Sequence, residues 1–278
     1  MNRVVKLIAY ILVTIFAFVL ILPILWMVVG AFKTTPDFLK KAPEILPEIW
    51  KLDNFKRLFT FPVLQWMMNS FFVATITSLA VIIISTTAGY AFAIKIKKGA
   101  EPVFWILMCS MMIPATGTMV PTYVLISNLG LVDRLAGLII PGMFSIVYIF
   151  FYRQYVRDIP TEIIDVADID GAGEIQKFVR IILPLSKPAV ITMFLLTFIG
   201  KFNGYMWPLI ILMSENKWTL PLGTQRILLN DQLQRIQGLP NYGLQSAAGL
   251  FLLIPMVLVF TIGHKYFVKG LWGGGNKG

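Results

Sequence analysis

The sequence has few charged residues for its length. Only 14% of its 278 residues are charged, whereas 57% are hydrophobic. An ordinary soluble domain has about 25% charged residues because its core needs a polar surface around it. The composition therefore excludes a soluble globular protein and predicts a membrane protein whose surplus apolar side chains face lipid.

Cysteine and histidine are nearly absent, with Cys109 and His264 the single examples. One cysteine cannot form an intrachain disulfide, and no cluster of Cys or His residues is present to bind zinc or an iron–sulfur cluster. No Ser-His-Asp or paired-carboxylate arrangement can be assembled from the apolar segments. We therefore predict that the protein is not an enzyme and has no catalytic or metal-binding residue. We expect His264 to lie at a membrane interface.

The sequence also lacks a phosphate-binding loop, since the pattern G-x-x-x-x-G-K-[ST] occurs nowhere. The glycine-rich end, residues 273–278, resembles such a loop only in composition, because no strand precedes it and no helix follows it. We expect a flexible tail there. Energy for any work must then come from a partner protein or an ion gradient.

Basic residues outnumber acidic ones, which gives a net charge of +10. They are scattered between apolar segments and form no continuous patch of the kind that binds nucleic acid. We therefore expect them to contact anionic lipid headgroups, and we predict no nucleic-acid partner.

Long stretches with little or no charge are the main feature that is present. Each holds about 20 residues, enough for a helix to cross a hydrocarbon core of about 30 Å. Such segments must be helical because lipid offers no hydrogen bonds to the backbone. The first apolar run is too long for a cleaved signal sequence, so we expect a retained anchor. We predict six membrane-spanning helices, at 7–32, 69–93, 103–126, 136–156, 188–212 and 244–267.

The positions of basic residues predict the orientation of these helices. The N-terminal tail, the 95–101 connection and the C-terminal tail are all basic and lie on one side, so we predict that both termini are cytoplasmic. The connections 33–62 and 214–243 then lie outside. We divide the chain into residues 1–68, an anchor helix with an external segment, and residues 69–278, a core of five helices.

The third long connection, 157–187, is cytoplasmic and predicts a short helical hairpin. Thr161 can cap a helix whose first turn carries Glu162 and Asp165. Gly171 and Gly173 can end that helix in a sharp left-handed turn, and a second helix begins near Glu174. Three apolar residues of the first helix share one face: Ile163, Val166 and Ala167. Three more follow in the second helix: Phe178, Ile181 and Ile182. Such an apolar knob suits docking into a groove of a soluble partner, and the alternative is a solvated loop that packs on its own helix bundle.

The loop resembles a known family. The pattern IPTEIIDVADIDGA from Ile159, with Phe178 and the later ILPLSKP from Ile182, resembles the cytoplasmic "EAA" loop of ATP-binding-cassette (ABC) importer permeases, and the sugar-importing branch most of all. FNGYMWPLI from Phe202, WTLPLG from Trp218 and YFVKGLWGGGNKG from Tyr266 are similar to other parts of that branch. The sequence departs from the pattern where the motif's Glu-Ala-Ala reads Asp165-Val166-Ala167 and where Phe202 replaces a frequent Trp.

The resemblance implies an all-α integral membrane protein with six transmembrane helices and the type I ABC importer permease fold. It implies one of two nonidentical permease subunits in an ATP-driven importer of a sugar, with an oligosaccharide favoured, in the inner (cytoplasmic) membrane of a bacterium or archaeon. The implied partners are a second permease, a homodimeric cytoplasmic ATPase that uses ATP and Mg, and an extracytoplasmic sugar-binding protein received by 33–62 and 214–243. This chain itself would bind no cofactor. The resemblance assigns ATPase coupling to Glu162, Asp165, Val166, Ala167, Gly171, Ala172, Phe178, Leu183 and Pro184.

Lys201 is unusual because it lies within the predicted fifth span. A basic residue at the centre of a span costs about 2.5–3.5 kcal/mol unless it faces protein or water. We expect it to face the substrate pathway or a subunit interface, although a shifted helix would let it reach the outer interface. Pro208 should kink this helix. The other polar and aromatic candidates for a sugar pathway are Asn69, Ser70, Asn203, Tyr205 and Trp207.

Two alternatives remain open. A permease for a polyol, a polyamine or another small solute could use the same scaffold, and the loop does not separate these. An ion-coupled secondary transporter is less favoured, because the spans contain almost no ionisable group besides Lys201.

Overall fold

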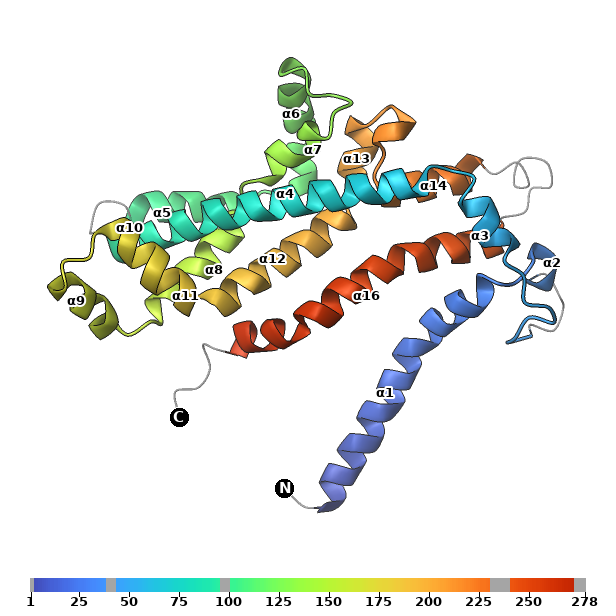
Figure 1. Ribbon diagram of the computed structural model, residues 1–278, viewed down its shortest axis with the longest axis horizontal. Coiled ribbons are helices and arrows are strands. Elements are labelled where there is room, and N and C mark those ends of the chain that lie inside the picture. Colours follow the sequence, from blue (N-terminus) through green and yellow to red (C-terminus); the bar gives the residue numbers. More distant parts are fainter. Residues whose placement is uncertain (1–2, 39–43, 96–100, 231–240, 273–278) are drawn as a thin grey trace. The chain divides into compact units, whose positions relative to one another are not determined.

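The computed structural model describes residues 3–38, 44–95, 101–230 and 241–272 (Figure 1). All regular secondary structure in these ranges is helical. The basic residues of 96–100, the polar residues 231–237 and the glycine-rich end 273–278 lie outside the described residues. The side chain of His264 also lies outside them, so its expected interfacial position stays a prediction.

Three described helices are each long and apolar enough to cross a membrane. They are α1 (Arg3–Gly30), α4 (Val63–Tyr90), which a π-helix η1 (Ala91–Lys95) continues, and α16 (Tyr242–Trp272). They confirm the helices predicted at 7–32, 69–93 and 244–267. Each forms because a long run of apolar residues without acidic interruption satisfies its own backbone hydrogen bonds.

Two other predicted spans are bent pairs of helices, so the prediction of continuous helices at 103–126 and 136–156 was wrong. In the first, α5 (Glu101–Cys109) and η2 (Ser110–Met112) meet α6 (Ala115–Asn128) at 100°. In the second, α7 (Ala136–Ile139) and η3 (Ile140–Gly142) meet α8 (Ile146–Arg157) at 44°. The sharper bend follows from Pro114, because a residue before proline avoids the helical region and Ile113 is extended (φ −81°, ψ 118°).

The predicted fifth span is also interrupted. Helix α12 (Lys187–Phe202) ends ten residues earlier than predicted, and α13 (Met206–Ile211) follows after a break at 203–205. Pro208 accounts for the break, since its ring clashes with the carbonyl of the residue four positions earlier, Gly204. If each bent pair forms one span, the described residues contain six candidate spans, and the third pair joins Glu174–Leu185 to α12 at 75°.

The segment before α12 is the connection 157–187, for which the sequence predicts a cytoplasmic helical hairpin. It contains α9 (Thr161–Ile169), α10 (Glu174–Lys177), the π-helix η4 (Phe178–Ile182) and α11 (Leu183–Leu185). Figure 1 shows α9 and α10 as a hairpin in which α9 projects away from the long helices of its unit.

Contacts group the chain into two compact units. The first contains Met1–Val63 and Gly223–Pro255, and the second contains Leu64–Leu222 and Met256–Gly278. The first unit includes α2 (Thr35–Phe38), α3 (Asp53–Leu58) and most of α14 (Leu220–Asn230), and the second includes η5 (Glu215–Lys217). The domains predicted from the sequence, 1–68 and 69–278, stay a prediction.

The second unit has two buried apolar clusters, one beside each candidate site. The first cluster packs α4, α6, α7 and α13 around Val73, Ile126, Leu138, Ile139, Ile211, Leu212 and Leu222. The second packs the end of α4 against α8, η4 and α12 through Tyr90, Tyr152, Val156, Ile182 and Met193. Burial of these side chains stabilises the packing of α13 and of η4, which follows the hairpin.

Two polar clamps join parts of the second unit that are far apart in the sequence. The Arg153 side chain is 2% exposed; its guanidinium donates to Glu101 Oε1 at 2.7 Å and to the Phe92 carbonyl at 3.1 Å, and lies 4.0 Å from the centre of the Phe104 ring. This clamp joins α8 to α5 and η1.

The second clamp is centred on Asp133, in the connection between α6 and α7. Its carboxylate accepts hydrogen bonds from the Lys217 amine at 2.7 Å, the Ser214 hydroxyl at 2.6 Å and the backbone N–H groups of Met213 and Ser214. The Lys217 and Ser214 side chains hold the pKa of this carboxyl far below its usual range. Asp133 has a positive φ of 57°, a conformation that Asp and Asn tolerate better than most residues.

Candidate functional site

The hairpin formed by α9 and α10 begins at Thr161, the residue predicted to cap it. Pro160, in an extended conformation, occupies the position before α9, and Thr161 is the first helical residue. The prediction that the Thr161 side chain caps the helix was wrong, because the hydroxyl now lies inside the first turn and makes no capping hydrogen bond. Glu162 lies in the first turn as predicted, whereas Asp165 lies beyond it.

The turn between α9 and α10 depends on Gly171. Its φ is +73°, and the surrounding backbone forms a Schellman motif: Ala172 N–H donates to Ala167 O at 3.0 Å and Gly171 N–H to Asp168 O at 3.1 Å. Gly173 instead has φ −67° and ψ 160°, so the prediction of a left-handed conformation at Gly173 was wrong. One left-handed residue is sufficient because the Schellman motif already reverses the chain.

Lys177 braces the hairpin, and Tyr90 links the brace to the end of α4. The residue is 5% exposed, and its amine forms ion pairs with Asp168 across the turn and with Glu174 Oε1 at 2.6 Å. The Tyr90 hydroxyl donates to Glu174 Oε2 at 3.1 Å, and the Tyr90 and Phe178 rings lie 5.1 Å apart. Sequence reasoning missed this brace, for which the only local signal was the i, i+3 spacing of Glu174 and Lys177.

The hairpin presents an apolar surface next to acidic side chains. Val166 is 57% exposed, Ile169 84% and Ile175 80%, while Ala167 is buried beneath them. The residues proposed for coupling therefore lie on both faces of the hairpin. Glu162, Asp165, Val166, Gly171 and Pro184 are exposed, Ala172, Phe178 and Leu183 are partly buried, and Ala167 is buried. We name the exposed residues Ile163, Val166, Ile169 and Ile175 the apolar knob.

Lys201 lies in the last turn of α12 and lines two cavities of the second unit. One has a volume of about 290 Å³ and the other about 330 Å³, and Pro141, Gly142 and Gly200 line both. A Cβ atom at Gly142 would lie 2.9 Å from Lys201 Nζ, so the amine occupies the space beside this glycine. Among the described residues, the amine has no hydrogen-bond or ion-pair partner.

The three pathway candidates that follow α12, which are Asn203, Tyr205 and Trp207, lie in different surroundings. Trp207 lines the 290 Å³ cavity, and its indole N–H donates to the Gly137 carbonyl at 3.1 Å, which fixes the ring. Tyr205 packs against the first apolar cluster, and Asn203 is exposed at the end of α12. Of these three residues, the structure brings only Trp207 to the cavity that Lys201 lines.

Asn69 and Ser70 are buried and hold a loop in place. The Asn69 amide donates to the carbonyls of Asn216 and Trp218, both at 2.9 Å, and Ser70 Oγ accepts the Leu220 N–H at 2.8 Å. Trp66 adds an N–H bond to the Glu215 carbonyl at 2.8 Å. These bonds tie the start of α4 to residues 215–220, and a contact of Asn69 or Ser70 with substrate stays a prediction.

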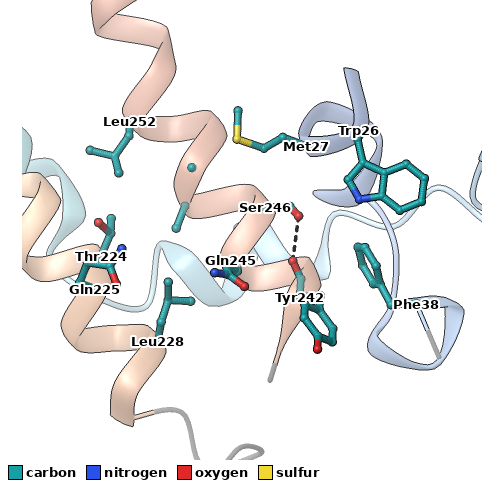
Figure 2. Close-up of a pocket in the computed structure, with 12 residues that line it drawn as sticks. Trp26, Met27, Phe38, Thr224, Gln225, Leu228, Tyr242, Gln245, Ser246 and Leu252 are labelled. Carbon is teal, nitrogen blue, oxygen red and sulfur yellow. Dashed lines mark hydrogen bonds between the residues drawn. The ribbon is translucent and has the colours of Figure 1, made fainter. Parts of the chain in front are cut away.

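A larger cavity, of about 580 Å³, lies in the first unit (Figure 2). The rings of Trp26, Phe38 and Tyr242 line it together with the amides of Gln225 and Gln245. None of its described lining residues is charged. The only sequence signal for this cavity is Trp26, near the end of the first predicted span, because tryptophan is typical of membrane interfaces.

No group of three or more His, Cys, Asp or Glu side chains among the described residues could hold a metal ion.

Comparison with known proteins relates the chain to a transport family. Residues 85–273 match the family described as "Binding-protein-dependent transport system inner membrane component". The arabinooligosaccharides transport system permease protein AraQ of Bacillus subtilis (strain 168) is 32% identical over 92% of this chain and 90% of its own length. The lactose transport system permease protein LacG of Rhizobium radiobacter is 28% identical over 98% of this chain and 97% of its own.

A solved structure shares the fold. A chain of a bacterial ABC transporter involved in the import of the acidic polysaccharide alginate superposes with a TM-score of 0.81, at 22% identity, over 95% of this chain and 97% of that one. The predicted type I ABC importer permease fold is therefore confirmed. Together with the family match over residues 85–273, this places the chain in the family of binding-protein-dependent transport system inner membrane components.

Proposed function

We propose that this chain is a permease subunit of an ATP-driven sugar importer, and that the sugar is an oligosaccharide. Membership of the binding-protein-dependent family and the similarity to AraQ and LacG support this proposal. The observation that carries it is the cytoplasmic hairpin. An exposed apolar knob, held by a Schellman turn and by the Lys177 brace, is a surface suited to a groove on a soluble partner.

The partner at the hairpin is a homodimeric cytoplasmic ATPase that binds ATP and Mg, while this chain binds no cofactor. Both termini of this chain lie in the cytoplasm. A second permease completes the translocation path, and an extracytoplasmic sugar-binding protein delivers the sugar to segments 33–62 and 214–243. In the hairpin, the exposed proposed residues contact the ATPase, whereas Ala167, Ala172, Phe178 and Leu183 hold the shape of the knob.

The translocation path passes the cavities around Lys201. The break between α12 and α13 supports this assignment, because interrupted helices in transporters surround substrate sites near the middle of the membrane. Trp207 offers a fixed aromatic face to a sugar ring.

Affinity purification of the chain from native membranes in mild detergent, followed by mass spectrometry, tests the proposal. We expect a second permease and an ABC ATPase to remain bound. Reconstitution of that complex with the binding protein should give sugar uptake that requires ATP. A chain that purifies alone and transports without an ATPase contradicts the proposal and favours coupling to an ion gradient.

A further inference from the structure

Lys201 is the only charged residue among the described residues that line the 290 and 330 Å³ cavities. The remaining lining side chains are apolar, aromatic or hydroxyl-bearing, and none of them is a carboxylate. The amine therefore places one positive charge in an otherwise neutral pair of cavities.

The Lys201 amine lies in space that Gly142 leaves open. A Cβ atom at Gly142 would lie 2.9 Å from Lys201 Nζ and 3.0 Å from Thr77 Cγ2. Any other residue at position 142 would displace either the amine or the Thr77 methyl group. The absence of a side chain at Gly142 therefore leaves the space in which the amine lies, next to the cavities.

The amine has three hydrogen-bond donors, and no described residue of this chain accepts from them. Lys201 lies in the last turn of α12, within a candidate membrane span, and a lysine charge in such a span is unfavourable unless it faces water or an opposite charge. A neutral sugar hydroxyl would satisfy a donor but not the charge. A carboxylate or phosphate would satisfy both, because charge-assisted hydrogen bonds are about twice as strong as neutral ones.

Threonine hydroxyls in the two cavities can form hydrogen bonds with the hydroxyl groups of a sugar. Thr118 and Thr122 line the 290 Å³ cavity and donate to backbone carbonyls of their own helix, so their oxygen lone pairs can still accept from sugar hydroxyls. Thr219 and Thr197, one lining each cavity, are buried with hydroxyls that have no partner among the described residues. The volumes lie near the lower end of the range of about 300–1,000 Å³ for ligand sites.

We propose that Lys201 is the specificity-determining residue of an anion subsite on the translocation path, and that the transported sugar carries a carboxylate or phosphate group. The Lys201 amine binds the acidic group, while threonine hydroxyls and the Trp207 ring contact the sugar. This inference rests on the proposed function, since it names the class of sugar that the importer carries.

The test uses the complete importer, with its ATPase, second permease and binding protein, in proteoliposomes. Uptake is measured for trigalacturonate, which carries carboxylates, for glucose 6-phosphate, and for neutral maltotriose, which has the same number of sugar units as trigalacturonate. The variants are Lys201→Gln, which removes the charge, and Lys201→Arg, which keeps it. The matched control is Arg134→Gln, which removes a positive charge from an exposed residue outside both cavities and outside the coupling loop.

We expect Lys201→Gln to lower uptake of an acidic sugar at least tenfold, which corresponds to about 1.4 kcal/mol. Any uptake of maltotriose should stay close to that of the unmodified importer. Lys201→Arg and Arg134→Gln should retain acidic-sugar uptake. Because the binding protein is the same in every preparation, a difference in uptake between variants is caused by the permease. The two acidic probes distinguish a carboxylate from a phosphate.

Two outcomes overturn the inference and leave the proposed function standing. One is ATP-dependent uptake of maltotriose alone, unchanged in Lys201→Gln. The other is an equal loss of all sugars in Lys201→Gln together with loss of the second permease on purification, which would assign Lys201 to an ion pair between subunits. Absence of ATP-dependent uptake of any sugar by the unmodified importer contradicts the proposed function as well.

Discussion

Replacement of Gly171 by valine should uncouple the ATPase without preventing membrane insertion. The φ of +73° at this position is unfavourable for any residue with a Cβ atom, by about 1–2 kcal/mol, and a β-branched residue lies at the upper end of that range. No atom lies within 4 Å of a Cβ built at Gly171, so the cost comes from the backbone alone. About 2 kcal/mol lowers the ratio of formed to unformed turn roughly 25-fold.

Gly173→Val provides a matched control two residues away. Gly173 is also exposed and also has no atom within 4 Å of a built Cβ, but its φ of −67° and ψ of 160° suit a β-branched residue. At such a position the substitution is neutral or slightly stabilising, because it restricts the unfolded chain. Gly171→Asn should have a smaller effect than Gly171→Val, since asparagine tolerates the left-handed region.

The assay is the amount of ATPase that copurifies with equal amounts of each variant, together with ATP-dependent uptake in proteoliposomes. We expect both to fall strongly for Gly171→Val, partly for Gly171→Asn and not at all for Gly173→Val. Equal losses in the two valine variants would refute the reasoning, because they would show that bulk on the knob matters and that the left-handed turn does not.

Three further predictions concern the two polar clamps and the Lys177 brace. Asp133→Asn keeps the backbone preference but removes the charge that pairs with Lys217. Because the pKa of Asp133 is lowered in the folded protein, its stabilisation is present above its unfolded pKa of about 3.9 and is lost as the pH falls toward the lower folded value. The melting temperature of the purified protein should therefore decrease when the pH is lowered below about 4. The part of this decrease that comes from Asp133 should be absent in Asp133→Asn. Arg153→Met leaves the Phe92 carbonyl without its donor and Glu101 with only the more distant Arg157, at 3.6 Å, and should lower the free energy of unfolding in mixed micelles by about 2 kcal/mol. Lys177→Met removes both ion pairs of the hairpin and should increase the rate of limited proteolysis between α9 and α10; an unchanged rate would show that the brace does not hold the loop.

The existence and approximate positions of the helices could be predicted from the sequence, because charged residues separate the apolar runs. The positions of the bends could not be predicted in this way, because a single proline hardly changes the mean hydropathy of an apolar run. Pro114 lies in the middle of a long apolar run, and it turns one predicted helix into two that meet at 100°. Pro208 was expected to kink its helix, but together with Gly204 it interrupts the helix completely.

Some features of the candidate site could likewise be predicted from the sequence, and others could not. The turn at Gly171 could be predicted because it follows from one residue and its neighbours. The brace could not, because Tyr90 and Glu174 are 84 residues apart in the sequence. The polar character of Asn69 suggested a substrate contact, yet its amide bonds the backbone of a loop 147–149 residues away, which no local pattern reveals.

The bonds between the start of α4 and residues 215–220 have a consequence for synthesis of the chain. Trp66, Asn69 and Ser70 emerge from the ribosome about 150 residues before the groups they bond. At about 5–20 residues per second, their polar atoms wait roughly 8–30 s for these partners. During that interval they must be hydrated or bonded to other groups, because an unpaired polar group in hydrocarbon is costly. The start of α4 therefore reaches its final environment only after most of the chain has been made, although α4 itself is among the first helices to be synthesised.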